Sequence, residues 1–183
     1  TALNKAISLD PDAAAPHNAA GLLLARTGIV SEAEVQFREA VRIDPNFGEA
    51  RQNLARLLAI RGKFDEAAWQ LENAVRIQPG DVTARITYAT VLYTQGAYEP
   101  ALQQASAAVQ LKLDSLEAHH VRGNVLERNN NVKEAIREYY ETVRLDPANA
   151  RVHLDLGAVL ADLGEKEQAL THLKQAAHSE QPD

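Results

Sequence analysis

The chain has 183 residues, of which 45% are hydrophobic and 24% are charged, so it has enough apolar material for a folded core. Its formal net charge of −6 has the wrong sign for a protein whose main task is to neutralise phosphates, and we expect no nucleic-acid partner. The sequence has no cysteine and no apolar run near the roughly 18 residues that span a bilayer, so we expect neither a disulfide framework nor a membrane partner.

Three kinds of residue recur along the chain with a period of 34 residues. The prolines of this series are Pro11, Pro45, Pro79 and Pro147, with Leu113 in the vacant place. The glycines are Gly28, Gly62, Gly96 and Gly164, with Asn130 in the remaining place. The alanines are Ala33, Ala67, Ala101, Ala135 and Ala169. A fixed period of this length indicates stacked copies of one supersecondary unit.

Each period contains two stretches of helical periodicity. In residues 48–81, Leu54 and Leu58 follow the first stretch, and Leu71 and Ala74 follow the second. We therefore expect two antiparallel helices in each period, and an all-α fold.

The turn residues predict where these helices end. A glycine ends the first helix where a left-handed residue is needed, and Asn130 is the residue best able to replace glycine there. Asp146-Pro147 and its equivalents end the second helix, because proline lacks an N–H and restricts the residue before it. Pro16 and Pro100 fit this scheme, since we expect both in the first turn of a helix.

A column of small residues also recurs on the first helix, a column being the set of equivalent positions in successive periods. We expect this column to face the alanine column of the second helix, so that the two backbones approach closely. Its members are Gly21, Ala55, Ala89, Gly123 and Gly157.

The hairpin of 34 residues resembles the tetratricopeptide repeat family. The family's small, large and proline positions are best matched in residues 48–81, by Leu54, Ala55, Leu58, Gly62, Phe64, Ala67, Leu71, Ala74 and Pro79. The resemblance implies a single array over residues 1–183, an α-α superhelix of about five and a half helix-turn-helix repeats. Its parts are the second helix of a truncated repeat at 1–13 and full repeats at 14–47, 48–81, 82–115, 116–149 and 150–183.

The chain departs from the family pattern at several positions. Where the family usually has an aromatic residue near the start of the first helix, this chain has His17, Arg51, Arg85, His119 and His153. Arg122 stands at a bulky apolar position and Leu113 replaces a proline, so we expect looser packing around residues 113–122.

The N-terminal end of the array predicts an exposed apolar edge. Residues 1–13 carry Leu3, Ile7 and Leu9 on the face that a missing first helix would cover, and solenoids need capped ends. We expect that the protein continues beyond Thr1, or that this edge docks on another chain, which includes self-association.

The sequence predicts no catalytic, metal or cofactor site. Histidines that share a column lie on helices about 9–10 Å apart, too far for one zinc ion whose ligands lie at about 2 Å. His172 and His178 miss the i, i+4 spacing of a helical metal pair, and the chain lacks phosphate-loop and nucleophile motifs. We expect a protein that is not an enzyme and needs no cofactor.

The resemblance places a concave groove along the first helices. The inner positions, which we expect to be exposed, are Asn18, Leu22, Glu49, Gln52, Asn53, Arg56, Thr83, Thr87, Thr90, Tyr93, Thr94, Glu117, His120, Asn124, Glu127, Arg151, Asp155 and Asp162. The candidate peptide-binding residues at the centre are Asn53, Arg56, Thr87, Thr90, Tyr93, His120 and Asn124. Amide and guanidinium groups bind a peptide backbone whatever its side chains, and a tyrosine offers a flat anchor. The alternative is that these positions are only hydrated surface.

Three functions fit these observations. The first is a non-catalytic scaffold that binds a protein or peptide partner in the concave groove. The second is the accessory repeat region of a larger enzyme, such as a glycosyltransferase or an electron-transfer protein, whose catalytic part lies outside this chain. The third is an assembly element that stacks through the edge of residues 1–13.

Overall fold

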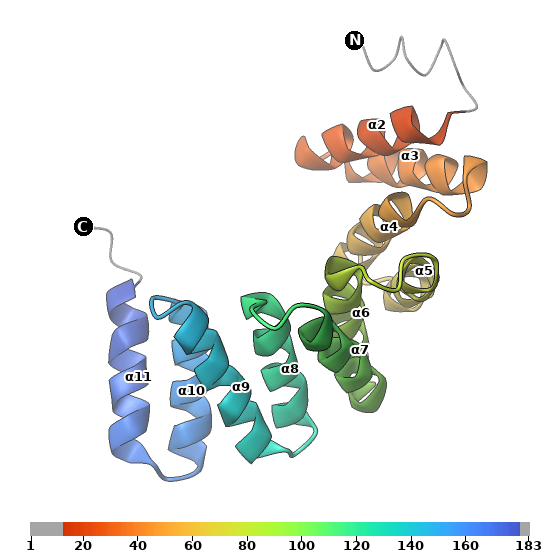
Figure 1. Ribbon diagram of the computed structural model, residues 1–183. Coiled ribbons are helices and arrows are strands. Elements are labelled where there is room, and N and C mark those ends of the chain that lie inside the picture. The colour runs from red at the N-terminus through yellow and green to blue at the C-terminus, as the bar shows by residue number, and fades with distance from the viewer. Residues whose placement is uncertain (1–12, 180–183) are drawn as a thin grey trace. The chain divides into compact units, whose positions relative to one another are not determined.

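The computed structural model describes residues 13–179, and within that range the chain forms ten α-helices and no strand (Figure 1). The first helices of the repeats are α2 (Ala14–Arg26), α4 (Gly48–Ile60), α6 (Val82–Thr94), α8 (Leu116–Arg128) and α10 (Ala150–Asp162). The second helices are α3 (Val30–Ile43), α5 (Phe64–Ile77), α7 (Tyr98–Leu111), α9 (Val132–Leu145) and α11 (Lys166–Ser179). Equivalent helices begin 34 residues apart throughout, which confirms the predicted all-α repeat and its period.

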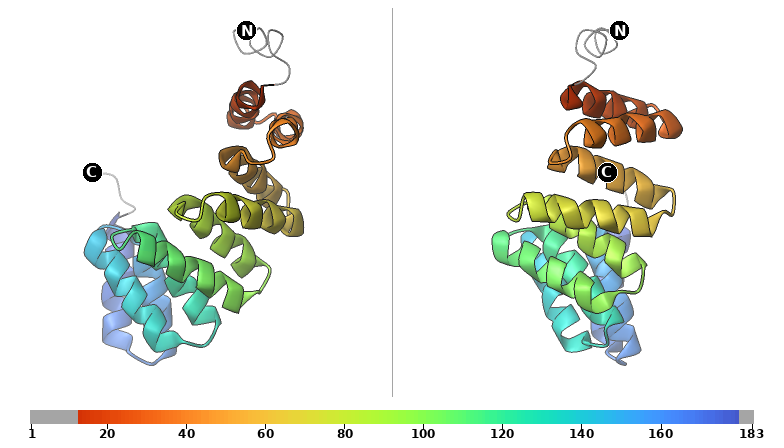
Figure 2. Two further views of the ribbon diagram at one scale, coloured as in Figure 1. Left: turned by 45° about the vertical axis from the view of Figure 1, so that its right-hand side comes forward. Right: turned by 90° about the vertical axis from the view of Figure 1, so that its right-hand side faces the viewer.

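The chain divides into two compact units, one that ends at Gln95 and one that begins at Gly96. In unit 1, α2 packs against α3 and α4 against α5, and α3 and α5 contact the next first helix. In unit 2, α8 packs against α9 and α10 against α11. Figure 2 shows the antiparallel pair α2 and α3 from two further directions. The helix and the apolar edge expected over residues 1–13 lie outside the described residues, apart from Ala13.

None of the helices within residues 13–179 combines the length and the apolar character that a membrane span requires.

The residue between the two helices of a repeat adopts the predicted left-handed conformation. The four glycines of this column have φ between 73° and 82°, and Asn130 has φ of 61°. Asn130 is the only non-glycine residue with positive φ in the described part of the chain. The N–H of Asn131 donates to the carbonyl of Leu126 (2.8 Å) and the N–H of Asn130 to that of Glu127 (3.1 Å), which satisfies two carbonyls at the end of α8.

The two helices of a repeat approach closely because the first helix carries small residues. The neighbour that explains the glycines differs from our expectation, since it is the large residue one turn beyond the alanine column. A Cβ added at Gly21 would lie 2.5 Å from the ring of Phe37, and one added at Gly123 would lie 2.5 Å from the ring of Tyr139. Both rings are fully buried, so a glycine on one helix makes room for an aromatic ring on the other.

The polar residues that replace the family's aromatic residue tie the preceding loop to the first helix. Each donates a hydrogen bond to the backbone carbonyl six residues earlier: Arg51 to Pro45 (2.8 Å), Arg85 to Pro79 (2.9 Å), His119 to Leu113 (3.0 Å) and His153 to Pro147 (3.0 Å). Because the acceptor is a backbone carbonyl, Leu113 serves as well as proline.

Glu138 on α9 organises the region in which we expected looser packing. Its carboxylate contacts Nδ1 of His119 at 2.8 Å and the guanidinium of Arg122 at 2.5 Å. Arg122 therefore has a charged partner at a position where other repeats pack an apolar side chain.

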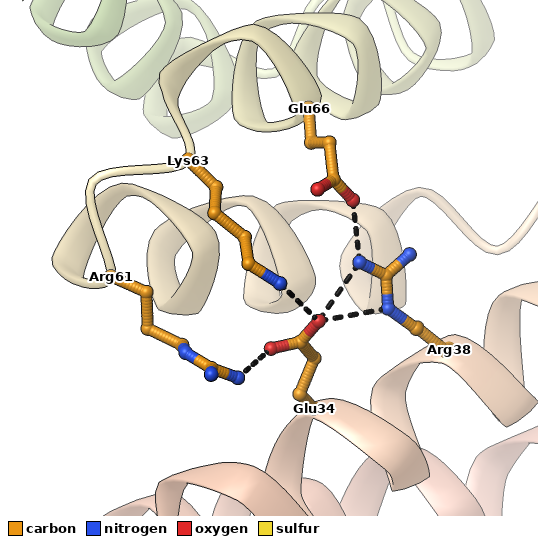
Figure 3. Close-up of polar contacts among 5 residues, drawn as sticks. All are labelled: Glu34, Arg38, Arg61, Lys63 and Glu66. Atoms are coloured by element: carbon orange, nitrogen blue, oxygen red, sulfur yellow. Dashed lines mark hydrogen bonds and ion pairs between the residues drawn. The ribbon is translucent and has the colours of Figure 1, made fainter.

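Glu34 on α3 is the centre of an ion-pair cluster that joins the first hairpin to the second (Figure 3). Its carboxylate pairs with Arg38 on the same helix, with Arg61 and with Lys63 at 3.1 Å, and Arg61 and Lys63 flank the turn between α4 and α5. Burial alone would raise the pKa of Glu34, but the hydrogen bonds and charges of Arg38 and Lys63 outweigh it and lower that pKa. The carboxylate therefore stays ionised and holds the two hairpins together at neutral pH.

His153 and His172 form a second tie, between α10 and α11. Their Nδ1 atoms lie 2.9 Å apart and their rings stack with centroids 5.2 Å apart, while Tyr140 lies edge-on to His172. Nε2 of His153 donates to the carbonyl of Pro147, so its Nδ1 accepts in the neutral ring and His172 donates. Burial, and then the charge of His153, lower the pKa of His172 below its ordinary value of 6.5.

We predict that replacing Gly123 by alanine destabilises the protein. Overpacking against Tyr139 costs about 1–3 kcal/mol, which exceeds the gain of up to about 1 kcal/mol in helix propensity. Thermal unfolding followed by circular dichroism measures the effect. Gly80→Ala is the matched control, because an added Cβ there meets no atom within 4 Å. Equal melting temperatures for the two variants would contradict the account of the helix contact.

We also predict that the α10–α11 hairpin loses stability in mild acid. His172 binds a proton more readily in the unfolded chain, so its contribution is complete above pH of about 6.5 and is lost as the pH falls toward its lower folded pKa. His172→Gln restores the residue found at Gln36 and Gln70, and His17 bonds Gln36 at 2.8 Å in the same geometry. Melting temperatures at pH of about 7.5 and 5.5 measure the effect. A variant whose melting temperature falls with pH as steeply as that of the wild type would refute it.

Candidate functional site

All seven candidate binding residues lie on first helices, and they fall into two sets. In unit 1, Asn53 and Arg56 lie on α4, and Thr87, Thr90 and Tyr93 lie on α6. In unit 2, His120 and Asn124 lie on α8. Within unit 1, α4 contacts both α2 and α6, so the first helices there are adjacent and form one face.

Asn53 connects two neighbouring first helices. Its side chain is 5% exposed, its Nδ2 donates to Oδ1 of Asn18 (2.9 Å), and its Oδ1 accepts from Arg56 (2.8 Å). Asn18 in turn donates to Glu49 (3.1 Å). The expectation that Asn18 and Asn53 are exposed is therefore wrong, because each amide is used to join α2 to α4.

His120 has the equivalent place in unit 2. Its Nε2 lies 2.5 Å from Oδ2 of Asp155 on α10, and only 8% of the residue is exposed. His120 and Asp155 are 35 residues apart, as are Asn18 and Asn53, so one polar contact recurs between successive first helices. The expected exposure of His120 is wrong for the same reason.

Two further polar side chains at the inner positions are committed to the fold. Gln52 is also buried, against our expectation, and donates to Asp81, the residue that caps α6 (2.6 Å). Asn124 is half-buried, and its Oδ1 accepts from the hydroxyl of Tyr139 (2.9 Å). These contacts hold the first-helix face in a fixed arrangement.

The threonines of α6 use their hydroxyl hydrogens within the helix. Thr87 donates to the carbonyl of Thr83 and Thr90 to that of Ile86, each at 2.9 Å. Thr90 is exposed, and Thr87 and Tyr93 are half-buried. The two threonines therefore present oxygen acceptors to a ligand.

A hollow lies on the first-helix face of unit 1, between α2 and α4. Its volume is about 160 Å³, and the residues that line it are Leu22, Ala25, Phe37, Asn53, Arg56, Leu57 and Ile60. Leu22 is 38% exposed and Ile60 is 80% exposed. This volume is well below the roughly 300 Å³ of small-molecule pockets and suits one or two side chains. The hollow brings together two of the candidates, Asn53 and Arg56, beside exposed apolar side chains.

Ile60 is a residue of this hollow that we did not predict. The signal was present, because the other members of its column are Arg26, Thr94, Arg128 and Asp162. An apolar side chain in an otherwise polar and exposed column indicates a specific use of that position.

Among residues 13–179, no three histidine or carboxylate side chains gather in a group that could hold a metal ion.

Four family models match the sequence along most of its length. Models described as tetratricopeptide repeat match residues 1–46, 37–68 and 58–124, and one described as TPR repeat matches residues 123–164. No curated protein sequence gives a significant match.

Solved structures of tetratricopeptide repeat proteins share the fold. YrrB, described as a TPR protein with an unusual peptide-binding site, is 23% identical with a TM-score of 0.80, over 98% of this chain and 93% of its own. MamA from Desulfovibrio magneticus RS-1 is 21% identical with a TM-score of 0.83, over 91% and 94%. PilF of Pseudomonas aeruginosa is 22% identical with a TM-score of 0.82, over 93% and 78%. The repeat models and the shared fold together show that the chain belongs to the tetratricopeptide repeat family.

Proposed function

We propose that the chain is a non-catalytic scaffold that binds a peptide segment of a partner protein on the first-helix face. The observation that carries this proposal is the hollow between α2 and α4, in which Asn53 and Arg56 lie beside Leu22 and Ile60. The tetratricopeptide fold, typical of interaction scaffolds, and the peptide-binding site described for YrrB support it.

The apolar part of the hollow serves as the anchor. Ile60 exposes 80% of its surface to solvent, and burying such a side chain against a ligand gains about 25 cal/mol for each Å² removed from water. A leucine or phenylalanine of the peptide would enter between Leu22 and Ile60 and contact Leu57.

Arg56 orients the peptide backbone beside this anchor. Its guanidinium is exposed, and the bond from one terminal nitrogen to Asn53 fixes its direction. The remaining N–H groups can donate to the carbonyl oxygens of an extended peptide. Since Asn53 is held by Asn18, the arginine is positioned before the ligand arrives, which lowers the entropy that binding costs.

The other candidates extend the proposed surface. Thr87 and Thr90 would accept hydrogen bonds from peptide N–H groups, and Tyr93 would contact a side chain. His120 and Asn124 mark the corresponding position on α8 of unit 2, where the tie to Asp155 fixes the imidazole of His120.

We predict that Arg56→Glu and Ile60→Glu each weaken peptide binding by at least about tenfold, or about 1.4 kcal/mol. Both side chains are exposed, so neither change removes a core contact. Peptides of about twelve residues, selected from a random displayed library on the whole chain, are the probes. Isothermal titration calorimetry measures their affinity for each variant.

Arg144→Glu is the control, because it makes the same charge change at an exposed arginine of α9. Its affinity should equal that of the wild type. Selected peptides that bind the Arg56 and Ile60 variants as tightly as the wild type would overturn the proposed site.

A further inference from the structure

Trp69, the only tryptophan of the chain, is an exposed residue on a helix that otherwise buries its large apolar side chains. It lies on α5, the second helix of its repeat, where Leu71 is fully buried, yet Trp69 exposes 55% of its surface. The equivalent positions hold Val35, Gln103, Arg137 and Thr171, so the repeat fold does not require an aromatic residue there. Tryptophan is enriched among the residues that dominate binding energy in protein interfaces.

Arg51 holds the indole ring in place. Its guanidinium carbon lies 5.4 Å from the centre of the Trp69 ring, a distance at which cation and ring attract each other. The arginine is only 6% exposed, and it is fixed by bonds from Nε to the carbonyl of Pro45 (2.8 Å) and from one terminal nitrogen to Gln70 (2.7 Å). The ring therefore presents a rigid surface.

The charge of Arg51 is poorly compensated. Its fixed bonds go to uncharged acceptors, and no ion pair within the described residues includes it. Burial, and then the positive charge of Arg76, lower the pKa of Arg51, while Asp44 raises it. A carboxylate brought near this guanidinium would gain favourable Coulomb energy in a partly desolvated place.

A hollow of about 310 Å³ lies beside Trp69, between α3 and α5. Its apolar lining comes from Val41, Pro45, Leu54 and Trp69. Its polar lining comes from Arg38, Arg42, Arg51 and Gln70. It therefore combines an apolar floor with three cations and no carboxylate, in a chain whose net charge is negative.

Arg38 separates this hollow from a second one with a different lining. The second hollow, of about 360 Å³, shares Arg38, Trp69 and Gln70 with the first but adds Asp65 and Glu66. Figure 3 shows the guanidinium of Arg38 held between the carboxylates of Glu34 and Glu66, 2.5 Å from the latter. An anionic ligand is thus favoured in the first hollow and disfavoured in the second.

We propose that the first hollow, here named the Trp69 surface, binds a peptide segment of a partner protein in which acidic residues flank a bulky apolar side chain. The apolar side chain would pack on Trp69 and over Val41 and Leu54. The acidic side chains would lie beside Arg42 and Arg51. This surface lies on the second helices of unit 1 and does not depend on the proposed binding site of the first-helix face.

Trp69 itself provides the measurement. The probe is a blocked hexapeptide of sequence Asp-Glu-Phe-Leu-Asp-Glu, which contains no tryptophan or tyrosine, so the indole emission of the whole chain reports only on Trp69. We expect a saturable shift of that emission to shorter wavelength, because the peptide removes the ring from water. A peptide with Lys in place of each acidic residue, and one with Ser-Gly in place of Phe-Leu, should produce no saturable shift.

Arg42→Glu tests the role of charge, and Arg144→Glu is its matched control. The two arginines occupy equivalent positions, both are exposed, and each pairs with a glutamate three residues earlier. We expect the affinity for the acidic peptide to fall at least about fivefold in the Arg42 variant and to stay unchanged in the Arg144 variant.

Several results would overturn the proposal. One is the absence of a saturable emission change for the wild type with the acidic peptide at millimolar concentration, and another is equal affinity in the Arg42 and Arg144 variants. A short thymidine oligonucleotide that shifts the emission as well as the peptide does would show that the surface responds to negative charge alone. Binding that is lost in Arg56→Glu but kept in Arg42→Glu would place the peptide on the first-helix face instead.

Discussion

The left-handed residue between the two helices of a repeat is the constraint on which the rest of the structure depends. It reverses the chain two residues after the first helix ends, and the second helix begins two residues later, as in Arg26, Gly28 and Val30. Helix lengths of 13 and 14 residues then recur with this turn, so every side chain keeps its direction from one repeat to the next. Asn130 shows that the constraint is the backbone conformation and not the glycine itself.

This fixed register places the same pair of positions in contact between successive first helices. Asn18 with Asn53 and His120 with Asp155 are two uses of one contact, with a side chain that meets a residue 35 positions later. At the second helices the register allows a different solution, since Glu34 stands where other repeats have Ala68, Leu102, Ile136 and Leu170. Arg61 and Lys63 supply the cations that make this buried carboxylate tolerable.

The backbone of the described residues could be predicted from the sequence, because it follows from the period and the turn residues. The helix starts at Ala14 and Gly48 agree with the repeat boundaries that the prolines and glycines predicted. The burial of Asn53 and His120 could not be predicted in the same way. It depends on which side chains reach across to the next repeat, and amide and imidazole groups are equally common on hydrated surfaces.

Single exceptions in a column carried more functional information than the repeated residues did. Ile60 and Trp69 each stand in a column of mostly polar residues, and each lines a hollow of unit 1. The repeated residues explain packing, whereas the exceptions have no packing role that the other repeats share. A scaffold in which every repeat has the same backbone can acquire a binding site only through such individual side chains.

The central claim is that the first-helix face of unit 1 is the peptide-binding surface of this chain. The most direct test is to titrate the isotope-labelled chain with a selected peptide and to map the changes in its backbone amide chemical shifts. The account predicts saturable changes centred on Leu22, Asn53, Arg56 and Ile60. Changes confined to the second helices, or spread evenly over both units, would contradict it.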